Sequence, residues 1–352
     1  MQGVCFKSVE RVVSQSIPDP KIIEPGDAIV RVSMAGLCGS DLHPFFGREV
    51  GLDVGTVMGH EMVGEIVELG PAAKSQGKDD LAVGDRVFTP FSTNCGECYY
   101  CKSGLSSRCL SGQLFGWVEN EKGLAGCQSE FVRVPMANST LMKAPDGLTD
   151  ESALLLGDNF STGFYCAEMA EIRPGGIYVV IGCGTVGQLC VVAARSMGAE
   201  KVFAIDLVPE RREQVERLGA IALAPDKSAL ETIKQATDGR GADAVMELVG
   251  LPTAQEFAFA AVRAGGILSV IGCHCTPNFA FSPVDAYDKN LTYRTGRCPA
   301  RHYMDQLTQR VVAGEFDLSS FITHRFGVNE AERAYEVFSG RQDGCLKAVL
   351  EF

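Results

Sequence analysis

The chain has 352 residues, of which 46% are hydrophobic and 22% charged, and its formal net charge is −12 at pH 7. This length exceeds one ordinary hydrophobic core and predicts two globular domains. The acidic balance argues against nucleic acid and anionic membranes as partners, because both need a basic face. No apolar run reaches the ~18 residues of a membrane helix. Fourteen cysteines and a start unlike a signal peptide lead us to expect a reducing cytoplasm.

Residues 1–156 contain short β-branched segments interrupted by glycine and proline, such as DAIVRVSMAG and EMVGEIVELG. This pattern predicts an irregular β-rich domain. Two groups of chemically active side chains fall in its loops, CGSDLH at residues 38–43 and GHE at residues 59–61. Neither motif is decisive alone, but a thiol, imidazoles and carboxylates in one domain indicate a metal site.

Four cysteines follow with the spacing C-x2-C-x2-C-x7-C, at Cys95, Cys98, Cys101 and Cys109. Four thiolates fill the tetrahedral shell of Zn²⁺ and leave no open position, so the spacing predicts a structural zinc site. The bacterial iron–sulfur spacing is C-x2-C-x2-C-x3-C-P, whereas here seven residues separate the last two cysteines and Leu110 follows. The reaction must therefore be sought elsewhere in the chain.

After about Gly163, strands alternate with helices, and the strands read GIYVVIG, KVFAID, DAVMELVG and GGILSVIG. Such alternation predicts a parallel, doubly wound sheet. From about Thr295 the pattern is mixed again, and we expect the strand-like LKAVLEF to return to the first domain. The predicted fold is therefore α/β, with a β-rich domain of residues 1–156 and 295–352 and a dinucleotide-binding Rossmann domain of residues 157–294.

The turn after the first of these strands carries the glycine fingerprint GCGTVG, followed by a helix that we expect from Gln188. Gly182 permits the tight turn, and Gly184 lets backbone N–H groups approach a pyrophosphate. Gly187 allows close packing of the helix. The predicted cofactor loop comprises Gly182, Gly184, Thr185, Val186 and Gly187.

Asp206 closes the next strand, at the distance expected for the acidic residue of this fingerprint. A carboxylate there accepts hydrogen bonds from both hydroxyls of the adenine ribose and repels a 2′-phosphate, which favours NAD over NADP. Arg211 and Arg212 could hold such a phosphate, but in the helix VPERREQVERLG we interpret them as solvated surface charges.

Together these motifs resemble the zinc-dependent medium-chain dehydrogenase family, the alcohol dehydrogenases. GHEMVGEIVELGPAA is similar to the family's zinc signature and CGSDLH to its metal loop, and the four-cysteine lobe and GCGTVG follow in the family's order. The resemblance covers essentially the whole chain. It implies a GroES-like catalytic domain, two zinc ions per chain, NAD, a small alcohol, aldehyde or ketone as substrate, and a homodimer or homotetramer.

Carried over to this chain, the family pattern makes Cys38 and His60 ligands of a catalytic zinc. LLGDNFSTGFYCAE resembles the segment that supplies an aspartate in bacterial secondary-alcohol and formaldehyde-type relatives, so Asp158 is the expected third ligand. A helix N-cap is the alternative role of Asp158. Glu61 is expected near the metal, as an occasional ligand or behind the ligands. Asp41 is expected to accept a hydrogen bond from the far nitrogen of His60.

One thiolate, one carboxylate and one imidazole leave the fourth zinc position open, as in a catalytic site. The resemblance implies that a proton leaves through the Ser40 hydroxyl, then the nicotinamide ribose, then the His43 imidazole. Arg301 resembles the family's late arginine on the cofactor pyrophosphate, although nearby Arg297 leaves this assignment open. Trp117 lies in a segment similar to the substrate pocket of bacterial secondary-alcohol relatives, and a core or interface role is equally open.

The motif Cys273-His274-Cys275 looks like a metal cluster, but it ends a strand in which alternate side chains point to opposite faces, so we reject it as a zinc site. The preferred function is oxidation of a small alcohol. A polyol (sorbitol-type) dehydrogenase is one rival, and a formaldehyde dehydrogenase is another, although those relatives carry a long extra loop for which this chain has little room. A zinc- and nucleotide-binding sensor would be expected to lose the open-site ligands and keep the lobe cysteines, whereas both sets remain here.

Overall fold

The computed structural model describes residues 1–73 and 81–352. They form two compact units: unit 1 is Met1–Ser161 with Pro299–Phe352, and unit 2 is Thr162–Cys298. The boundaries taken from the sequence lie five and four residues earlier. Helix α5 (Asn159–Met169) runs across the first boundary. In the described ranges, no helix is long and apolar enough to cross a membrane.

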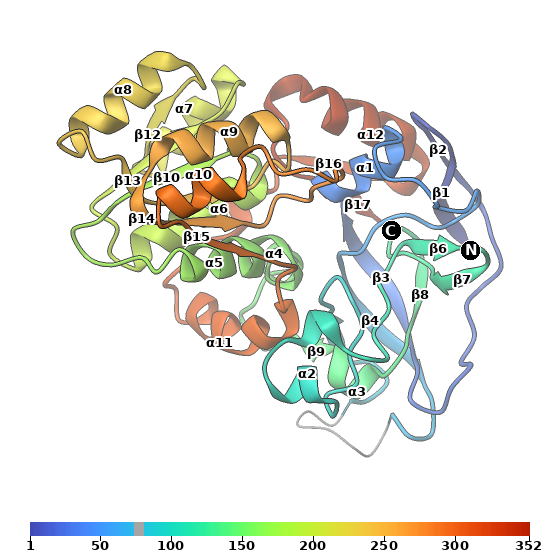
Figure 1. The fold of residues 1–352 in the computed structure, drawn as a ribbon. Coiled ribbons are helices and arrows are strands. Elements are labelled where there is room, and N and C mark those ends of the chain that lie inside the picture. The colour runs from blue at the N-terminus through green and yellow to red at the C-terminus, as the bar shows by residue number, and fades with distance from the viewer. Residues whose placement is uncertain (74–80) are drawn as a thin grey trace. The chain divides into compact units, whose positions relative to one another are not determined.

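Unit 1 is built on a seven-stranded sheet with the strand order β16-β17-β3-β4-β5-β9, in which β8 also pairs with β3 (Figure 1). Its strands are β3 (Ala28–Gly36), β4 (Met62–Leu69), β5 (Arg86–Phe88), β8 (Phe131–Val134), β9 (Met142–Lys143), β16 (His324–Gly327) and β17 (Ala348–Glu351). Two hairpins accompany the sheet, β1 (Gln2–Ser8) with β2 (Arg11–Ser16) and β6 (Trp117–Glu119) with β7 (Lys122–Leu124).

The middle of β3 alternates between buried and exposed residues. Val30 and Val32 are buried, whereas Arg31 and Ser33 between and after them are exposed, as expected for a strand with one face on the core. Strand β17 pairs antiparallel with β3, with Val349 opposite Gly36. The expected return of the last segment to the first domain is thereby confirmed.

The described helices of unit 1 include three single turns and three longer helices. They are α1 (Leu42–Phe45), α2 (Tyr99–Lys102), α3 (Ala137–Thr140), α4 (Asp150–Gly157), α11 (Ala300–Val312) and α12 (Ala331–Gly340), with 3-10 turns η1 (Gly39–Asp41), η2 (Ser106–Arg108), η3 (Ser319–Phe321), η4 (Val328–Glu330) and η5 (Gln342–Gly344). Tyr335 and Phe338 of α12 join a second core with Val4 of β1 and Leu37. The loop after β3, which begins with Leu37, is thus packed against α12 and β1.

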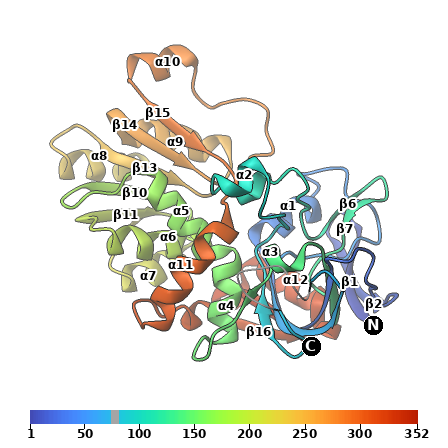
Figure 2. The same ribbon diagram turned by 90° about the horizontal axis from the view of Figure 1, so that it is seen from below.

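Unit 2 is a six-stranded parallel sheet with the order β12-β11-β10-β13-β14-β15 (Figure 2). The strands are β10 (Ile177–Ile181), β11 (Lys201–Ile205), β12 (Ile221–Leu223), β13 (Ala242–Glu247), β14 (Val262–Val270) and β15 (Thr292–Thr295). The helices are α6 (Thr185–Ser196), α7 (Pro209–Arg217), α8 (Lys227–Ala236), α9 (Pro252–Ala261) and α10 (Pro283–Asp288). This order is that of a doubly wound dinucleotide fold, in which the strands after β10 are added first on one side of it and then on the other, so that the strand order switches between β10 and β13. The predicted fold class is confirmed.

Two details of unit 2 differ from the sequence-based expectation. Helix α6 begins at Thr185, three residues before Gln188, because Gly184 already has the extended backbone of an N-cap. Strands β12 and β15 were not predicted: β12 has only three residues and exposes Ile221, and β15 reads TYRT without an apolar run.

Candidate metal centres and active site

Pairing of β3 with β4 brings the two sequence motifs of the catalytic site together. The strands are antiparallel, with Ala35 opposite Met62, so the end of β3 lies beside the start of β4. Cys38 follows the first strand and His60 precedes the second. The backbone N–H of Gly36 also donates to the carbonyl of Glu61 at 3.2 Å. Two loops far apart in sequence are therefore held at one edge of the sheet.

The side chains of Cys38, His60, Glu61 and Asp158 offer ligand atoms that lie within 4.8 Å of one another. Asp158 Oδ2, between α4 and α5, is 3.5 Å from Cys38 Sγ and 3.5 Å from His60 Nε2. Ser40 Oγ is 3.3 Å from the same imidazole nitrogen. All of these groups except Ser40 are buried. The structure thus brings together the thiol, imidazole, carboxylate and hydroxyl that the sequence analysis selected.

Asp41 fixes the two loops relative to each other. Its Oδ2 accepts a hydrogen bond from the backbone N–H of Cys38 at 2.9 Å, and its Oδ1 lies 3.2 Å from His60 Nδ1. The predicted contact of Asp41 with the far nitrogen of His60 is confirmed. With Nδ1 turned to a carboxylate, Nε2 is left to face Cys38 and Asp158.

Lys347 and Asn159 belong to this site but escaped the sequence analysis. Lys347, 1% exposed, places Nζ 2.5 and 2.7 Å from the two carboxylate oxygens of Glu61 and donates to the carbonyl of Leu37 at 2.9 Å. Asn159 Nδ2 donates to Glu61 Oε1 at 2.9 Å and to Asp158 Oδ2 at 3.2 Å. Two features of the sequence could have identified these residues. Lys347 stands at the start of an apolar strand, and Asn159 follows an expected metal ligand.

The charges of the site suit a bound cation. Burial lowers the pKa of Lys347 by itself, but the charges of Glu61 and Cys38 outweigh it and raise the pKa above its ordinary value. Burial, followed by the charge of Asp158, raises the pKa of the Cys38 thiol. Lys347 thus faces the carboxylates of Glu61 and Asp158 and the thiol of Cys38, and a divalent cation at the same place would interact favourably with these groups. A thiol, an imidazole and a carboxylate are donors that Zn²⁺ prefers.

The four cysteines of the lobe also converge. Their sulfur atoms lie within 4.8 Å of one another, with Cys98 Sγ 3.6 Å and Cys95 Sγ 4.0 Å from Cys101 Sγ. A tetrahedral zinc with Zn–S bonds of about 2.3 Å places its sulfurs ~3.8 Å apart. Backbone N–H groups of Cys101 and Leu110 lower the pKa of Cys98 to about 6. Burial and the neighbouring Cys98 raise the pKa of Cys101 to about 12, because a second thiol must ionise beside the first. The lobe fits a closed zinc site.

In unit 2, the glycine fingerprint forms the turn between β10 and α6. Gly182 has φ +90°, a conformation that side chains rarely adopt. A Cβ at Gly187 would lie 1.7 Å from the carbonyl oxygen of Gly182. The helix therefore approaches the turn so closely that only glycine fits, and its first N–H groups are left to face a ligand.

Asp206 ties this turn to the next strand. Its Oδ2 accepts from the backbone N–H of Cys183 at 2.6 Å and its Oδ1 from that of Val208 at 2.8 Å. The interpretation of Arg211 and Arg212 as solvated surface charges is wrong. Arg211 is 18% exposed with Nη1 3.9 Å from Asp206 Oδ2, and Arg212 donates to the carbonyls of residues 206 and 207. Both guanidinium groups therefore lie beside the residues that follow β11.

Three predicted residues lie apart from the metal cluster. The guanidinium of Arg301, on the first turn of α11, donates to the carbonyl of Ser139 at 3.1 Å and pairs with Asp305 at 3.2 Å, and its role toward pyrophosphate stays a prediction. Trp117 is half-buried in the β6–β7 hairpin. His43 is in α1, and burial followed by the charge of Arg48 lowers its pKa.

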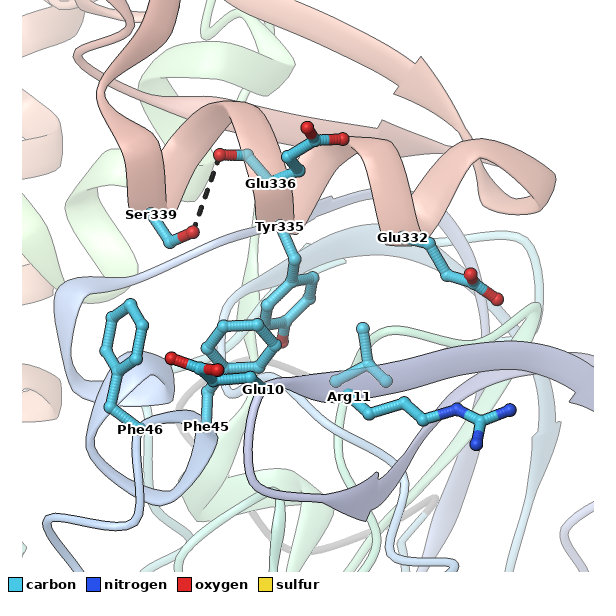
Figure 3. A pocket seen from close by; sticks show the side chains of 9 residues that line it. Glu10, Arg11, Phe45, Phe46, Glu332, Tyr335, Glu336 and Ser339 are labelled. Carbon is cyan, nitrogen blue, oxygen red and sulfur yellow. Dashed lines mark hydrogen bonds between the residues drawn. The ribbon is translucent and has the colours of Figure 1, made fainter.

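A cavity of about 280 Å³ opens between α1, α12 and β2 (Figure 3). None of the candidate metal ligands lines it. Tyr335 lines this cavity and also supports the loop that carries Cys38. Its hydroxyl donates to Gln128 Oε1 at 2.9 Å, and Gln128 Nε2 donates to the carbonyl of Gly36 at 3.1 Å. We therefore interpret the cavity as a surface feature behind the site.

Two family models match the chain. Residues 24–146 match the alcohol dehydrogenase GroES-like domain, and residues 185–313 match the zinc-binding dehydrogenase model. A zinc-type alcohol dehydrogenase B of Aspergillus flavus is 39% identical, over 96% of this chain and 79% of that protein. The chain belongs to the zinc-dependent medium-chain alcohol dehydrogenase family.

Other members of the family agree over nearly the full length. The solved alcohol dehydrogenase from a Thermus species is 34% identical with a TM-score of 0.91, covering 100% of this chain and 99% of that one. A sorbitol dehydrogenase of Bacillus subtilis is 28% identical over 99% of this chain and 97% of that protein. The predicted family is confirmed, and the chain is an enzyme of the alcohol dehydrogenase family.

Proposed function

We propose that the chain is an NAD-dependent zinc enzyme that oxidises a small primary or secondary alcohol to its aldehyde or ketone, reversibly. The cluster of Cys38, His60 and Asp158, with the Ser40 hydroxyl 3.3 Å from the metal-facing nitrogen of His60, carries this proposal. A zinc ion held by the three ligands would supply a Lewis acid that lowers the pKa of an alcohol. The four-cysteine lobe would hold a second zinc without chemistry.

The chain's own residues perform the proton chemistry in this proposal. Ser40 receives the proton of the substrate hydroxyl, and His43 passes it to solvent. Because the pKa of His43 is lowered, its imidazole is neutral at pH 7 and is able to accept a proton. Asp41 keeps the His60 ring oriented, and Lys347 balances Glu61 behind the ligands. The hydride leaves the alcohol carbon as the carbonyl forms.

We propose NAD as the acceptor of that hydride because Asp206 lies at the end of β11, where it would face the adenine ribose. Binding NADP would place the 2′-phosphate beside this buried carboxylate, and the two negative charges would repel each other. Arg211 is the specific observation in favour of NADP, since its guanidinium lies 3.9 Å from Asp206 and near the glycine turn. Comparing kcat/KM for the two cofactors decides between them.

The experiment that tests the function follows NADH absorbance with a panel of primary alcohols, secondary alcohols, polyols and hydrated formaldehyde. Elemental analysis of the same sample should find two zinc ions per chain. A fully zinc-loaded protein that reduces neither NAD nor NADP with any alcohol would contradict the proposal. A polyol substrate is the second candidate, favoured by the full-length similarity to a sorbitol dehydrogenase, and selective turnover of polyols would establish it.

A further inference from the structure

Cys273 and Cys275 form a pair of thiols that neither metal centre uses. All fourteen cysteines lie in the described residues, and five of them belong to the two candidate centres. Seven of the others are buried, whereas Cys273 and Cys275 are exposed. Their sulfur atoms also lie within 4.8 Å of each other. The exposed thiols of the chain are therefore neighbours.

His274 anchors the segment that carries this pair. Its Nε2 lies 3.1 Å from Glu247 Oε2 and 3.2 Å from Gln255 Nε2. Glu247 is fully buried at the end of β13, so the imidazole between the cysteines is held against the sheet while both thiols remain exposed. Holding the middle residue keeps the two sulfurs close, which favours a reaction between them.

We propose that Cys273 and Cys275 form a dithiol modification site that an aliphatic disulfide oxidises to a disulfide within the loop. The thiolate of one cysteine attacks a sulfur of glutathione disulfide, breaks its S–S bond and releases one glutathione. The second cysteine then attacks the protein sulfur of the mixed disulfide and releases the other. Two electrons pass from the protein to the reagent, and the two thiol protons end on the two released glutathione molecules. The sulfurs must approach to about 2.05 Å.

The pair lies at the edge of the sheet where doubly wound folds bind dinucleotides. It follows β14, whose last residue Val270 is opposite Glu247 of β13, and Glu247 is in turn opposite Ile181, which precedes the glycine turn. Ligands of such folds bind beyond these carboxyl ends. A bound dinucleotide should therefore shield the dithiol. This shielding rests on the proposed function, whereas the thiol chemistry does not.

Peptide mapping of the zinc-loaded protein tests the dithiol. The protein is treated with oxidised glutathione, blocked with N-ethylmaleimide under denaturing conditions and digested with trypsin. Peptide 264–289 contains Cys273 and Cys275 and no other cysteine. We expect it to lose two hydrogen atoms and take up no maleimide, while peptides with Cys5 and Cys345 remain reduced. Oxidation of the lobe cysteines before this peptide would overturn the proposal.

Single and double variants separate the two chemical steps. Cys273→Ser and Cys275→Ser should each stop at one glutathione adduct, because no second thiol resolves the mixed disulfide. The double variant should take up none. If either single variant still loses two hydrogen atoms in this peptide, or neither forms an adduct, the assignment is wrong.

Adding NAD tests the shielding on the same protein. At ten times its dissociation constant, NAD should slow the disulfide about tenfold, because about one molecule in eleven remains unliganded. NAD binding, measured separately by calorimetry, without any slowing would overturn the placement of the pair at the cofactor edge. A disulfide that forms in a protein unable to bind NAD would uphold the dithiol and refute the proposed function.

Discussion

Replacing Lys347 by methionine tests whether the buried ion pair with Glu61 stabilises unit 1. Both side chains are almost fully buried, with exposures of 1% and 0%. Removing one partner of such a pair costs about 3–5 kcal/mol, because a buried charge is left uncompensated. The carbonyl of Leu37 also loses its donor at 2.9 Å, which adds to the cost. At about 2–4 °C per kcal/mol the melting temperature of unit 1 should fall by about 6–20 °C.

The assay can follow unit 1 selectively because Trp117 is the sole tryptophan and lies in that unit. Urea unfolding monitored by its fluorescence gives the free energy for the parent, Lys347→Met, Glu61→Gln and the double variant. The double variant should lose less than the sum of the two single losses, with a coupling energy of about 1–3 kcal/mol. Arg31→Met is the matched control, because it removes an exposed pair with Glu65 and should change stability by less than about 1 kcal/mol.

Zinc should reduce the effect of Lys347→Met, because a bound cation offsets part of the charge of Glu61. The loss should therefore be larger after chelation than in the zinc-loaded protein. A single variant as stable as the parent, or a double variant that shows only the sum of the two single losses, would refute the idea that Lys347 compensates Glu61.

Four further predictions concern the two metal centres and the cofactor loop. Asp158→Asn should abolish turnover while leaving the melting temperature near that of the parent. Cys101→Ser should make the four-cysteine lobe protease-sensitive, and its activity should be lost only as structure is lost. The reverse pattern would reject the ligand assignment. His43→Gln should keep both zinc ions and lower the rate of alcohol oxidation about 10²-fold near pH 7, with partial recovery at higher pH as hydroxide replaces the lost base; a pH profile parallel to the parent would remove His43 from proton transfer. Asp206→Gly should narrow the preference for NAD over NADP in kcat/KM, and an unchanged ratio would speak against Asp206 as its origin. Gly187→Ala should weaken dinucleotide binding measured by calorimetry, because a Cβ there meets the carbonyl of Gly182 at 1.7 Å, and unaltered affinity would show that the turn relaxes.

Several of the predicted site residues belong to short motifs in which reactive side chains are close in sequence. Cys38, Ser40 and Asp41 lie within four positions, so their loop could be selected as a candidate before the fold was known. The structure then brought His60 and Asp158 to this loop through strand pairing, as the family resemblance implied.

The residues that escaped prediction act across long separations. Lys347 is 286 positions from Glu61, and in LKAVLEF it was interpreted only as part of a strand. Its role depends on the register of β17 on β3, which no local pattern contains. The environment of Arg211 likewise depends on how α7 folds back over β11, so a helix pattern alone gave the wrong interpretation.

Placement of β17 beside β3 has a consequence for the order in which the protein folds. Unit 2 is continuous, from Thr162 to Cys298, whereas unit 1 joins segments on either side of it. During synthesis the β3–β4 edge emerges long before Lys347, which meets the carbonyl of Leu37 over 310 positions. Contacts of such separation form slowly. Glu61 therefore remains without its lysine while the whole of unit 2 is made, and this buried ion pair is among the last contacts of unit 1 to form.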